Sequence, residues 1–421
     1  MPTKNSPAPL RRSSPLGHRR GLLPLAVAAL SLLGLLGLSA CSSSGPKPAR
    51  LSSITPSLTL NTKWSVSTDR LPSVAMGQAA FAPAVSEGLV VVASPKGRVA
   101  AFALKTGEAV FDLDLKTGLA AGVGGGTGLG AGLFAVVTTA GELALVDSKG
   151  QQRWRVPMGG VAHERPVIAG GSVVVRLADN RVAAFSQETG ARRWVVQRTL
   201  PSLVLHGQSG LRSAQDGAVE QPSDALGAVD LVAGLPGARL LWLNATNGAV
   251  RWETTVVAPR GSNEVERLAD VLGEPALAAD TVCVAAYQNQ VSCHEAASGR
   301  AKWTARLDVS QPAMADQRLV VAVEANSRVH AFDRETGEKR WAQQGLFLRG
   351  LTEPVSYDQA IWVADQEGYL HGLSRETGAL VARLSLPGGK PSGRLLVTRE
   401  GLLVQTQSGR LVLLVAATAA K

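Results

Sequence analysis

Short β-branched apolar runs separated by polar turns recur along most of the chain. In residues 172–176 and 181–185, two such runs flank a polar turn, which is the pattern of a hairpin of half-buried strands. A turn of the form Ser/Asp-x-x-Thr-Gly follows, and the next apolar run carries a Trp. No long stretch with a 3.6-residue period appears after residue 40, so the sequence predicts an all-β fold.

The same unit recurs with a nearly constant length. Five copies open with a residue followed by Pro, and four of these close with an aromatic residue 28 or 29 positions after the Pro. The four pairs are Pro83 and Phe111, Pro166 and Trp194, Pro275 and Trp303, and Pro312 and Trp341. The fifth copy opens at Pro354 and has Ala382 in the aromatic position, and two more copies are recognisable by their ends at 142–154 and 239–252. Marker glycines fall at 107, 150, 190, 248, 299, 337 and 378. Their typical spacing of about 40 residues is that of β-propeller blades, and the wider gap before Gly248 marks an insertion.

The two ends of the repeat region complete one another. Residues 393–416 give three strands without a closing Trp strand, whereas residues 59–66 resemble a last strand with Trp64 in the marker position. Pairing them would seal the ring and remove two open sheet edges. The sequence therefore predicts an eight-bladed β-propeller of four-stranded blades over residues 58–421, closed by an N-terminal strand. A seven-bladed ring, in which one irregular copy forms only a loop, is the alternative.

The N-terminus has the layout of a lipoprotein signal. Residues 1–40 combine a basic segment with an apolar one, and Leu38-Ser39-Ala40 before Cys41 match a bacterial lipobox. A retained transmembrane helix is the alternative, because the apolar length would permit one. Ser42 in place of Asp favours the outer membrane. We therefore expect lipidation of Cys41, an outer-membrane protein that faces the periplasm, and a flexible tether over residues 41–57, which are rich in Ser and Pro.

Charge and cysteine content narrow the picture further. The formal net charge is +10, but residues 1–40 hold five Lys/Arg and no acid, so the remainder is near +5. No run of basic residues interleaved with aromatic ones occurs, and no nucleic-acid partner is expected. Cys283 and Cys293 flank the polar turn 287–290 on adjacent predicted strands. They form either a periplasmic disulfide or two buried thiols, and the sequence leaves both open.

The repeat Ala-x-Asp-x-x-Thr-Gly-x-x-x-Trp, most complete at 331–341, resembles the pyrroloquinoline-quinone-type propeller repeat. Two families share it, the quinoprotein dehydrogenases and the BamB lipoproteins of the outer-membrane β-barrel assembly machinery. A lipobox before a single propeller is similar to the BamB layout, as are three stretches outside the repeat pattern, at 200–207, 261–271 and 367–371. This resemblance implies a scaffold that aids insertion of barrel proteins and binds the periplasmic POTRA region of BamA and other subunits of the complex.

Catalytic motifs are absent from the sequence. The six His residues show no metal-ligand spacing, no Gly-x-Ser-x-Gly occurs, and no vicinal Cys pair of the quinoprotein kind is present. The glycine-rich run 121–132 lacks a Gly-x-Gly-x-x-Gly in register and is expected to be a flexible lead-in to a blade. We therefore expect no catalytic residue, metal, cofactor or small-molecule substrate. A dehydrogenase dependent on pyrroloquinoline quinone and Ca²⁺ is the alternative.

Two of the three non-repeat stretches follow the Trp strands that end at Trp194 and Trp252, so both are connections between blades on one rim of the ring. A partner-binding patch is expected there, with apolar residues and a charged border. Its candidate residues are Leu203, Leu205, His206, Arg267 and Asp270. The alternative is that both Leu side chains pack their loop against the blade. His206 stands where the resembled family usually has Arg, so a fixed positive charge is not expected at that position.

Overall fold

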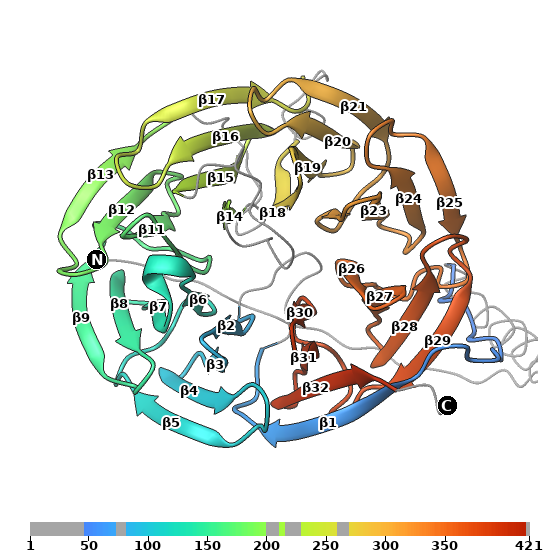
Figure 1. Cartoon of the computed structure of the whole chain (residues 1–421), viewed down its shortest axis with the longest axis horizontal. Coiled ribbons are helices and arrows are strands. Elements are labelled where there is room, and N and C mark those ends of the chain that lie inside the picture. Colours follow the sequence, from blue (N-terminus) through green and yellow to red (C-terminus); the bar gives the residue numbers. More distant parts are fainter. Residues whose placement is uncertain (1–45, 73–80, 199–209, 215–228, 259–268, 418–421) are drawn as a thin grey trace, which may run out of the picture. The chain divides into compact units, whose positions relative to one another are not determined.

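The computed structural model describes residues 46–72, 81–198, 210–214, 229–258 and 269–417. The predicted signal segment 1–40 and Cys41 lie outside these residues. Within the compact unit Pro48–Lys421, eight antiparallel sheets of four strands each stand around a common axis (Figure 1). The predicted eight-bladed all-β propeller is therefore confirmed, and the seven-bladed alternative is wrong.

The first four blades follow the chain, with the innermost strand first. Blade 1 comprises β2 (Ala84–Ser86), β3 (Leu89–Ala93), β4 (Arg98–Ala103) and β5 (Ala109–Asp114). Blade 2 comprises β6 (Gly124–Gly125), β7 (Leu133–Val137), β8 (Glu142–Asp147) and β9 (Gln152–Pro157), with the short 3₁₀ helix η1 (Gly128–Gly130) between its first two strands. Blade 3 comprises β10 (Val167–Ala169), β11 (Ser172–Arg176), β12 (Val182–Ser186) and β13 (Arg192–Val196). Blade 4 comprises β14 (Leu211–Ser213), β15 (Asp230–Leu235), β16 (Arg239–Asn244) and β17 (Val250–Thr255).

The remaining blades repeat this order, except that the last one borrows a strand. Blade 5 comprises β18 (Val271–Ala278), β19 (Thr281–Ala286), β20 (Gln290–Glu295) and β21 (Ala301–Arg306). Blade 6 comprises β22 (Met314–Ala315), β23 (Leu319–Val323), β24 (Val329–Asp333) and β25 (Lys339–Gln343). Blade 7 comprises β26 (Val355–Tyr357), β27 (Ala360–Ala364), β28 (Tyr369–Ser374) and β29 (Leu380–Ser385). Blade 8 comprises β30 (Leu396–Thr398), β31 (Gly401–Gln405), β32 (Arg410–Ala416) and β1 (Leu60–Ser67).

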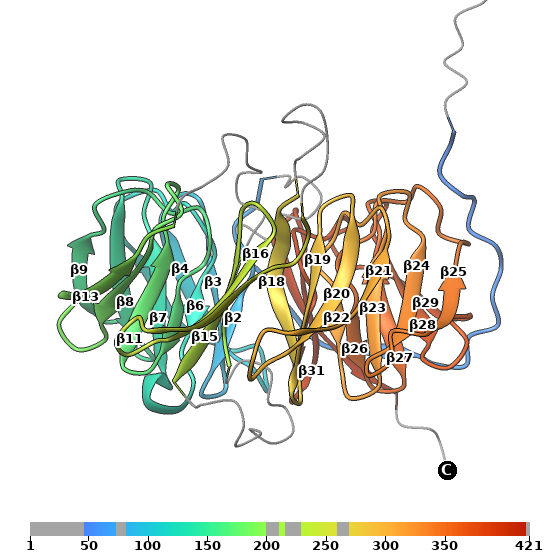
Figure 2. The ribbon, with the colours of Figure 1, turned by 90° about the horizontal axis from the view of Figure 1, so that it is seen from above.

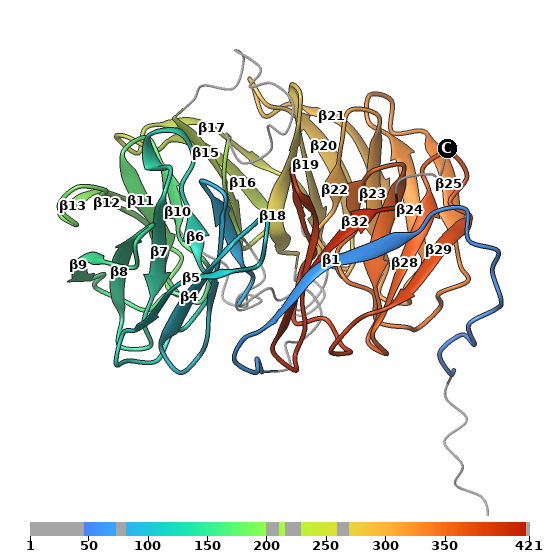
Figure 3. The same cartoon turned by 60° about the horizontal axis from the view of Figure 1, so that its bottom comes forward.

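Ring closure occurs as the sequence predicts. The N-terminal strand β1 pairs antiparallel with β32, in a register that runs from Leu60 opposite Ala416 to Ser67 opposite Arg410. Figure 3 shows β1 crossing the outer side of blade 8. The first and last described strands thus share one sheet, and neither end of the ring is left as an open edge.

Antiparallel order also fixes what each rim of the ring carries. In every blade the turn between the second and third strands lies on the same side as the connection that leads from the fourth strand to the next blade. We call this side the connection rim. The opposite rim carries the turns between the first and second strands and between the third and fourth. The edge-on view in Figure 2 separates the two rims.

Neighbouring blades are joined by one recurring contact between an indole and a glycine. Trp194 on the outer strand of blade 3 lies against Gly248 in the last turn of blade 4, and its Nε1 donates to the carbonyl of Ala245 at 3.0 Å. A Cβ on Gly248 would lie 2.8 Å from the indole, and its φ is +74°. Only glycine satisfies both conditions without strain. The same indole–glycine contact joins Trp64 to Gly107, Trp154 to Gly190, Trp252 to Gly299, Trp303 to Gly337 and Trp341 to Gly378, while Phe111 takes the place of the indole against Gly150.

The one missing marker aromatic has a structural reason. Ala382 lies on the outer strand of blade 7 and would have to meet the last turn of blade 8. Blade 8 has no such turn, because its third strand β32 and its outer strand β1 come from opposite ends of the chain. No glycine turn is available there, and an aromatic residue at 382 would have no such partner.

The glycine-rich run 121–132 is not the flexible lead-in that we expected. It forms the innermost strand β6 and the helix η1. A Cβ on Gly124 would lie 2.0 Å from the carbonyl oxygen of Pro166 in the next blade. Glycine is required there because two backbones approach each other closely.

Part of the expected flexible tether also contacts the ring. The Ala49 amide donates to the carbonyl of Phe347 at 2.8 Å, and the Ser57 amide donates to that of Val381 at 2.9 Å. Residues 49–58 therefore lie along blades 6 and 7 instead of extending freely from the domain.

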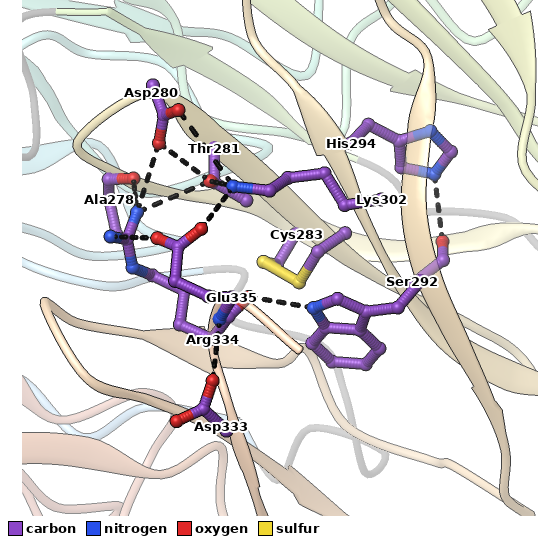
Figure 4. Close-up of a disulfide and its surroundings, with 12 residues drawn as sticks. Ala278, Asp280, Thr281, Cys283, Ser292, His294, Lys302, Asp333, Arg334 and Glu335 are labelled. Carbon is purple, nitrogen blue, oxygen red and sulfur yellow. Dashed lines mark hydrogen bonds and ion pairs between the residues drawn. A yellow bond between two sulfur atoms is a disulfide. The ribbon is translucent and has the colours of Figure 1, made fainter. Parts of the chain in front are cut away.

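Cys283 and Cys293 form a disulfide across β19 and β20, where they are direct cross-strand partners. Their Cα atoms are 4.1 Å apart, and both residues are fully buried. Of the two alternatives left open by the sequence, the disulfide is the one present. Figure 4 shows it beside an ionic network in which Arg334 of blade 6 donates to the carbonyl of Ala278 in blade 5.

The indole–glycine contact can be tested with a matched pair of glycines. Gly248→Ala should lower the free energy of unfolding by about 2–4 kcal/mol, because the new Cβ meets the indole of Trp194 at a positive φ. Gly159 has a φ of +75°, but no atom lies within 4 Å of the position that an added Cβ would take, so Gly159→Ala should cost only about 1 kcal/mol. Urea denaturation of both variants measures the difference, and equal losses would contradict the contact.

The disulfide makes a second prediction. Mass spectrometry without reduction should find the peptides of Cys283 and Cys293 joined. Reduction should lower the unfolding free energy by about 2–3 kcal/mol, as expected for a short closed loop. The double variant Cys283→Ala/Cys293→Ala should show no sensitivity to reductant. Alkylation of both thiols in the unreduced native protein would refute the bond.

Candidate functional site

The structure brings together the strand ends that flank both predicted partner-binding connections. One connection runs from Val196 at the end of β13 to Leu211 at the start of β14, and the other from Thr255 at the end of β17 to Val271 at the start of β18. The described strand ends that flank them therefore lie on the connection rim, on either side of blade 4. Leu203, Leu205, His206 and Arg267 themselves lie outside the described residues.

Asp270 does not have the exposed position that the sequence suggested. Its side chain is fully buried, and its Oδ1 accepts a hydrogen bond from the amide of Gly237 at 2.7 Å. Its own carbonyl accepts from the amide of Tyr287 at 2.9 Å. Asp270 thus ties the β15–β16 turn of blade 4 to the start of blade 5. The expectation that its charge borders the surface is corrected, because the carboxylate is used to satisfy backbone donors.

A buried arginine lies near Asp270, and sequence reasoning missed it. Arg176 at the end of β11 donates from Nε to Glu164 at 3.0 Å and also bonds Asn180. Burial lowers the pKa of Arg176 to about 10, and the negative charge of Asp270 opposes this decrease. Blades 3, 4 and 5 thus each contribute a buried polar group beside the strand ends that flank the two connections. Arg176 follows three valines in an apolar strand, and nothing in the strand pattern signals a charged partner in another blade.

A second charged group occupies the ring axis. It consists of residues on, or just before, the innermost strands, and we call it the axial cluster: Arg165, Arg212, Glu274, Glu353 and Arg394. Two nitrogens of Arg165 contact the two oxygens of Glu274 at 2.5 and 2.8 Å. Arg394 reaches Glu274 at 2.7 Å and Glu353 at 3.4 Å. These ion pairs link blades 3, 5, 7 and 8 across the axis.

The pKa values of the two glutamates in the axial cluster depend on two opposing effects, burial and the charges of the arginines. Burial would raise the pKa of Glu274, but the charges of Arg165 and Arg394 outweigh it and hold that pKa below the usual range. Burial raises the pKa of Glu353, and Arg394 only partly offsets this effect. Three guanidinium groups therefore surround two carboxylates at the place where the innermost strands converge.

This donor set does not fit the site of a quinoprotein. Calcium requires six to eight oxygen ligands, whereas the axial cluster presents more cationic than anionic side chains. Among the residues that the structure describes, no group of three or more His, Cys, Asp or Glu could hold a metal ion. The eight Trp residues are likewise used in packing: six make the indole–glycine contact, and Trp242 and Trp362 are buried within their blades.

The non-repeat stretch 367–371 forms part of a third charged group. Buried Arg349 donates from Nε to Asp365 at 2.7 Å and from Nη2 to Glu367 at 2.7 Å. The imidazole Nε2 of His371 lies 2.8 Å from the same Asp365 carboxylate, and the Tyr369 ring lies 5.9 Å from the guanidinium. Burial opposes ionisation of Asp365, but its bonds to His371 and Arg349 prevail and lower its pKa.

The described segments contain no helix with the length and apolar character needed to cross a bilayer.

A family profile, a related sequence and a solved structure all match most of this chain. The family profile described as "Outer membrane protein assembly factor BamB" matches residues 95–343 and 312–421. A protein of that name from Bordetella pertussis is 36% identical over 91% of this chain and 96% of its own length. The crystal structure of BamB from Moraxella catarrhalis superposes with a TM-score of 0.73 at 23% identity, covering 85% of this chain and 99% of that one.

The other family that shares the repeat is more distant. The quinohemoprotein alcohol dehydrogenase from Comamonas testosteroni superposes with a TM-score of 0.58 at 12% identity, covering 84% of this chain and 76% of that one. Likeness at this level reflects the propeller fold alone. With the family profile and a closely related sequence both spanning most of the ring, the chain belongs to the BamB family of outer-membrane protein assembly factors.

Proposed function

We propose that this protein is a non-catalytic scaffold lipoprotein that binds a periplasmic POTRA domain of BamA and thereby aids insertion of outer-membrane β-barrel proteins. Family membership supports a role in outer-membrane protein assembly. The observation that carries the finer proposal is the position of the two non-repeat connections. Their flanking strand ends lie on one rim, on both sides of blade 4, which supports a single interface shared by the two stretches that the repeat does not explain.

In this proposal Leu203 and Leu205 supply the apolar contact, and His206 and Arg267 supply polar contacts around it. Apolar anchors provide most of the affinity of such an interface, while charges at its border set orientation. Asp270 and Arg176 act below the surface as supports of the rim. A second function as a quinoprotein dehydrogenase has no observation in its favour, because arginines occupy the ring axis.

Anchoring is the first test. Cells supplied with radiolabelled palmitate should label this protein through Cys41, and Cys41→Ala should abolish the label. The double variant Cys283→Ala/Cys293→Ala is the matched control and should keep full labelling, because both residues are fully buried in blade 5. Label that persists on Cys41→Ala would overturn the lipidation proposal.

Partner binding is the second test. The triple variant Leu203→Ala/Leu205→Ala/His206→Ala should fold with an unchanged melting temperature but lose co-purification with BamA, with affinity reduced ~100-fold or more if the Leu pair is the anchor. Leu129 offers a control, because it is 84% exposed and lies in η1 on the opposite rim. Leu129→Ala should bind BamA like the parent.

Two results would count against the site. Full BamA binding by the folded triple variant would show that these three side chains are not the anchor. A large drop in its melting temperature would show that the Leu side chains pack their loop against the blade.

A further inference from the structure

The segment that precedes the propeller is fastened to the side of the ring. Its contacts extend over residues 49–58, which we call the docked strap. Ala49 bonds Phe347, Ser52 accepts from Arg383 at 2.7 Å, and the amides of Ser57 and Leu58 both donate to Val381. Figures 2 and 3 show this segment passing along the outer side of the ring beside β29.

The strap also has an inward and an outward side. Ala49, Leu51, Ile54 and Leu58 are half-buried, whereas the residues between them are exposed. Leu51 packs against the apolar cluster that contains Leu346 and Trp341. Specific side chains of the strap thus bury apolar surface against blades 6 and 7, in addition to its backbone hydrogen bonds.

Arg349 holds the beginning of the strap. Its guanidinium is 3% exposed and is fixed from behind by Asp365 and Glu367. The remaining nitrogen, Nη1, donates to the carbonyl of Ala49 at 3.0 Å. The strap therefore completes the hydrogen bonding of a buried cation, which a loosely adsorbed chain would not do.

The position of this contact limits how far the ring can lie from a lipid on Cys41. Ala49 lies eight residues after Cys41 along the chain, a reach of about 28 Å when fully extended. Without docking, the nineteen residues to Leu60 in β1 would reach about 65 Å. Phe347 and Arg349 belong to the connection between β25 and β26, so the short reach starts at the connection rim.

Charges near this point suit a phospholipid surface. Arg50 and Arg328 are exposed, and Arg328 belongs to the connection-rim turn whose Asn326 carbonyl accepts from the amide of Leu348. Exposed cations close to an anionic headgroup layer are attracted to it.

We propose that the docked strap orients the ring on the bilayer, with the connection rim at blades 6 and 7 held toward the phospholipid headgroups and the opposite rim turned away. The inference rests on the proposed lipidation of Cys41. It places the lipid attachment and the two connections that flank blade 4 on the same rim.

Strap docking is tested first without lipid. Hydrogen–deuterium exchange on the soluble chain from residue 42 onward should show the amides of Ala49, Ser57 and Leu58 exchanging at least ~10-fold slower than in a free peptide of residues 46–59. Leu51→Ser/Ile54→Ser should remove this protection without a change in the ring. Ser53→Ala/Thr55→Ala alters only exposed, uncharged strap positions and should retain it.

Arg349→Gln should also release Ala49. Should that variant fail to fold, the strap variants still test the proposal, because they leave the ring intact. Exchange at the rate of the free peptide in the parent protein would overturn docking, whatever the state of Cys41.

Orientation is tested with the acylated full-length protein in vesicles of phosphatidylethanolamine and phosphatidylglycerol that contain a phospholipid with a photoreactive headgroup. Connection-rim peptides around 324–328 and 386–390 should be labelled at least ~5-fold more than opposite-rim peptides around 334–337 and 375–378, since the reach from Ala49 is short. The Leu51→Ser/Ile54→Ser variant should lose this asymmetry, and the Ser53→Ala/Thr55→Ala control should keep it.

Equal labelling of both rims in the parent would overturn the proposed orientation. Failure of the chain to acquire palmitate or to bind vesicles would instead contradict the lipidation of Cys41. The exchange experiment would still decide whether the strap is docked.

Discussion

The contact between an indole of one blade and a glycine of the next is the constraint on which the ring depends. A single four-stranded sheet cannot bury both its faces, so each blade is stable only against its neighbours. The indole covers apolar surface and requires an acceptor for Nε1, which the next blade's last turn provides, as Trp194 shows at Ala245. That turn can receive the ring only where no Cβ is present, as at Gly248. One aromatic and one glycine per blade follow from this geometry, and so does their absence at Ala382, where the next blade has no closed turn.

Because this contact recurs at a fixed spacing, the sequence could predict the blades, their number and the closure by Trp64. What it could not predict are interactions between residues far apart in the chain that obey no period. Asp270 lies in a polar stretch and looked exposed, but it is buried, and it accepts from the Gly237 amide in the β15–β16 turn of the preceding blade. The run 121–132 looked flexible by composition, yet Gly124 is needed where its backbone approaches Pro166. The cysteine pair was only partly predictable. The sequence placed both residues on adjacent strands of one hairpin, but it did not show whether the disulfide forms.

The division of labour among charged groups follows from the same architecture. Indole–glycine contacts join neighbouring blades at the circumference, whereas the ion pairs of Glu274 with Arg165 and Arg394 join distant blades at the axis. The arginines of this axial cluster do not match the oxygen ligands that a Ca²⁺-dependent quinone site requires. Residues that take part in neither set of contacts can therefore vary most easily in the connections on the rims. One stretch outside the repeat pattern, 367–371, begins in the turn before β28 and continues into that strand, and it supports Arg349.

Docking of the strap has two consequences: it raises the effective concentration of the ring near the membrane, and it fixes the orientation of the ring. The two differ in size. A flexible chain of eight residues has a root-mean-square length of about 16 Å, and one of nineteen residues about 24 Å. The accessible volume near the membrane, and so the effective concentration of the ring there, changes only about fourfold between them. Such a gain is small compared with what an interface of ordinary affinity provides. The effect on orientation is larger, because a free tether permits either rim to face the bilayer, whereas a tether fixed at Arg349 does not. Under the proposed function, in which one rim meets a partner in the same membrane, the docked strap contributes mainly orientation. It is held by Arg349, Asp365 and the strap side chain Leu51.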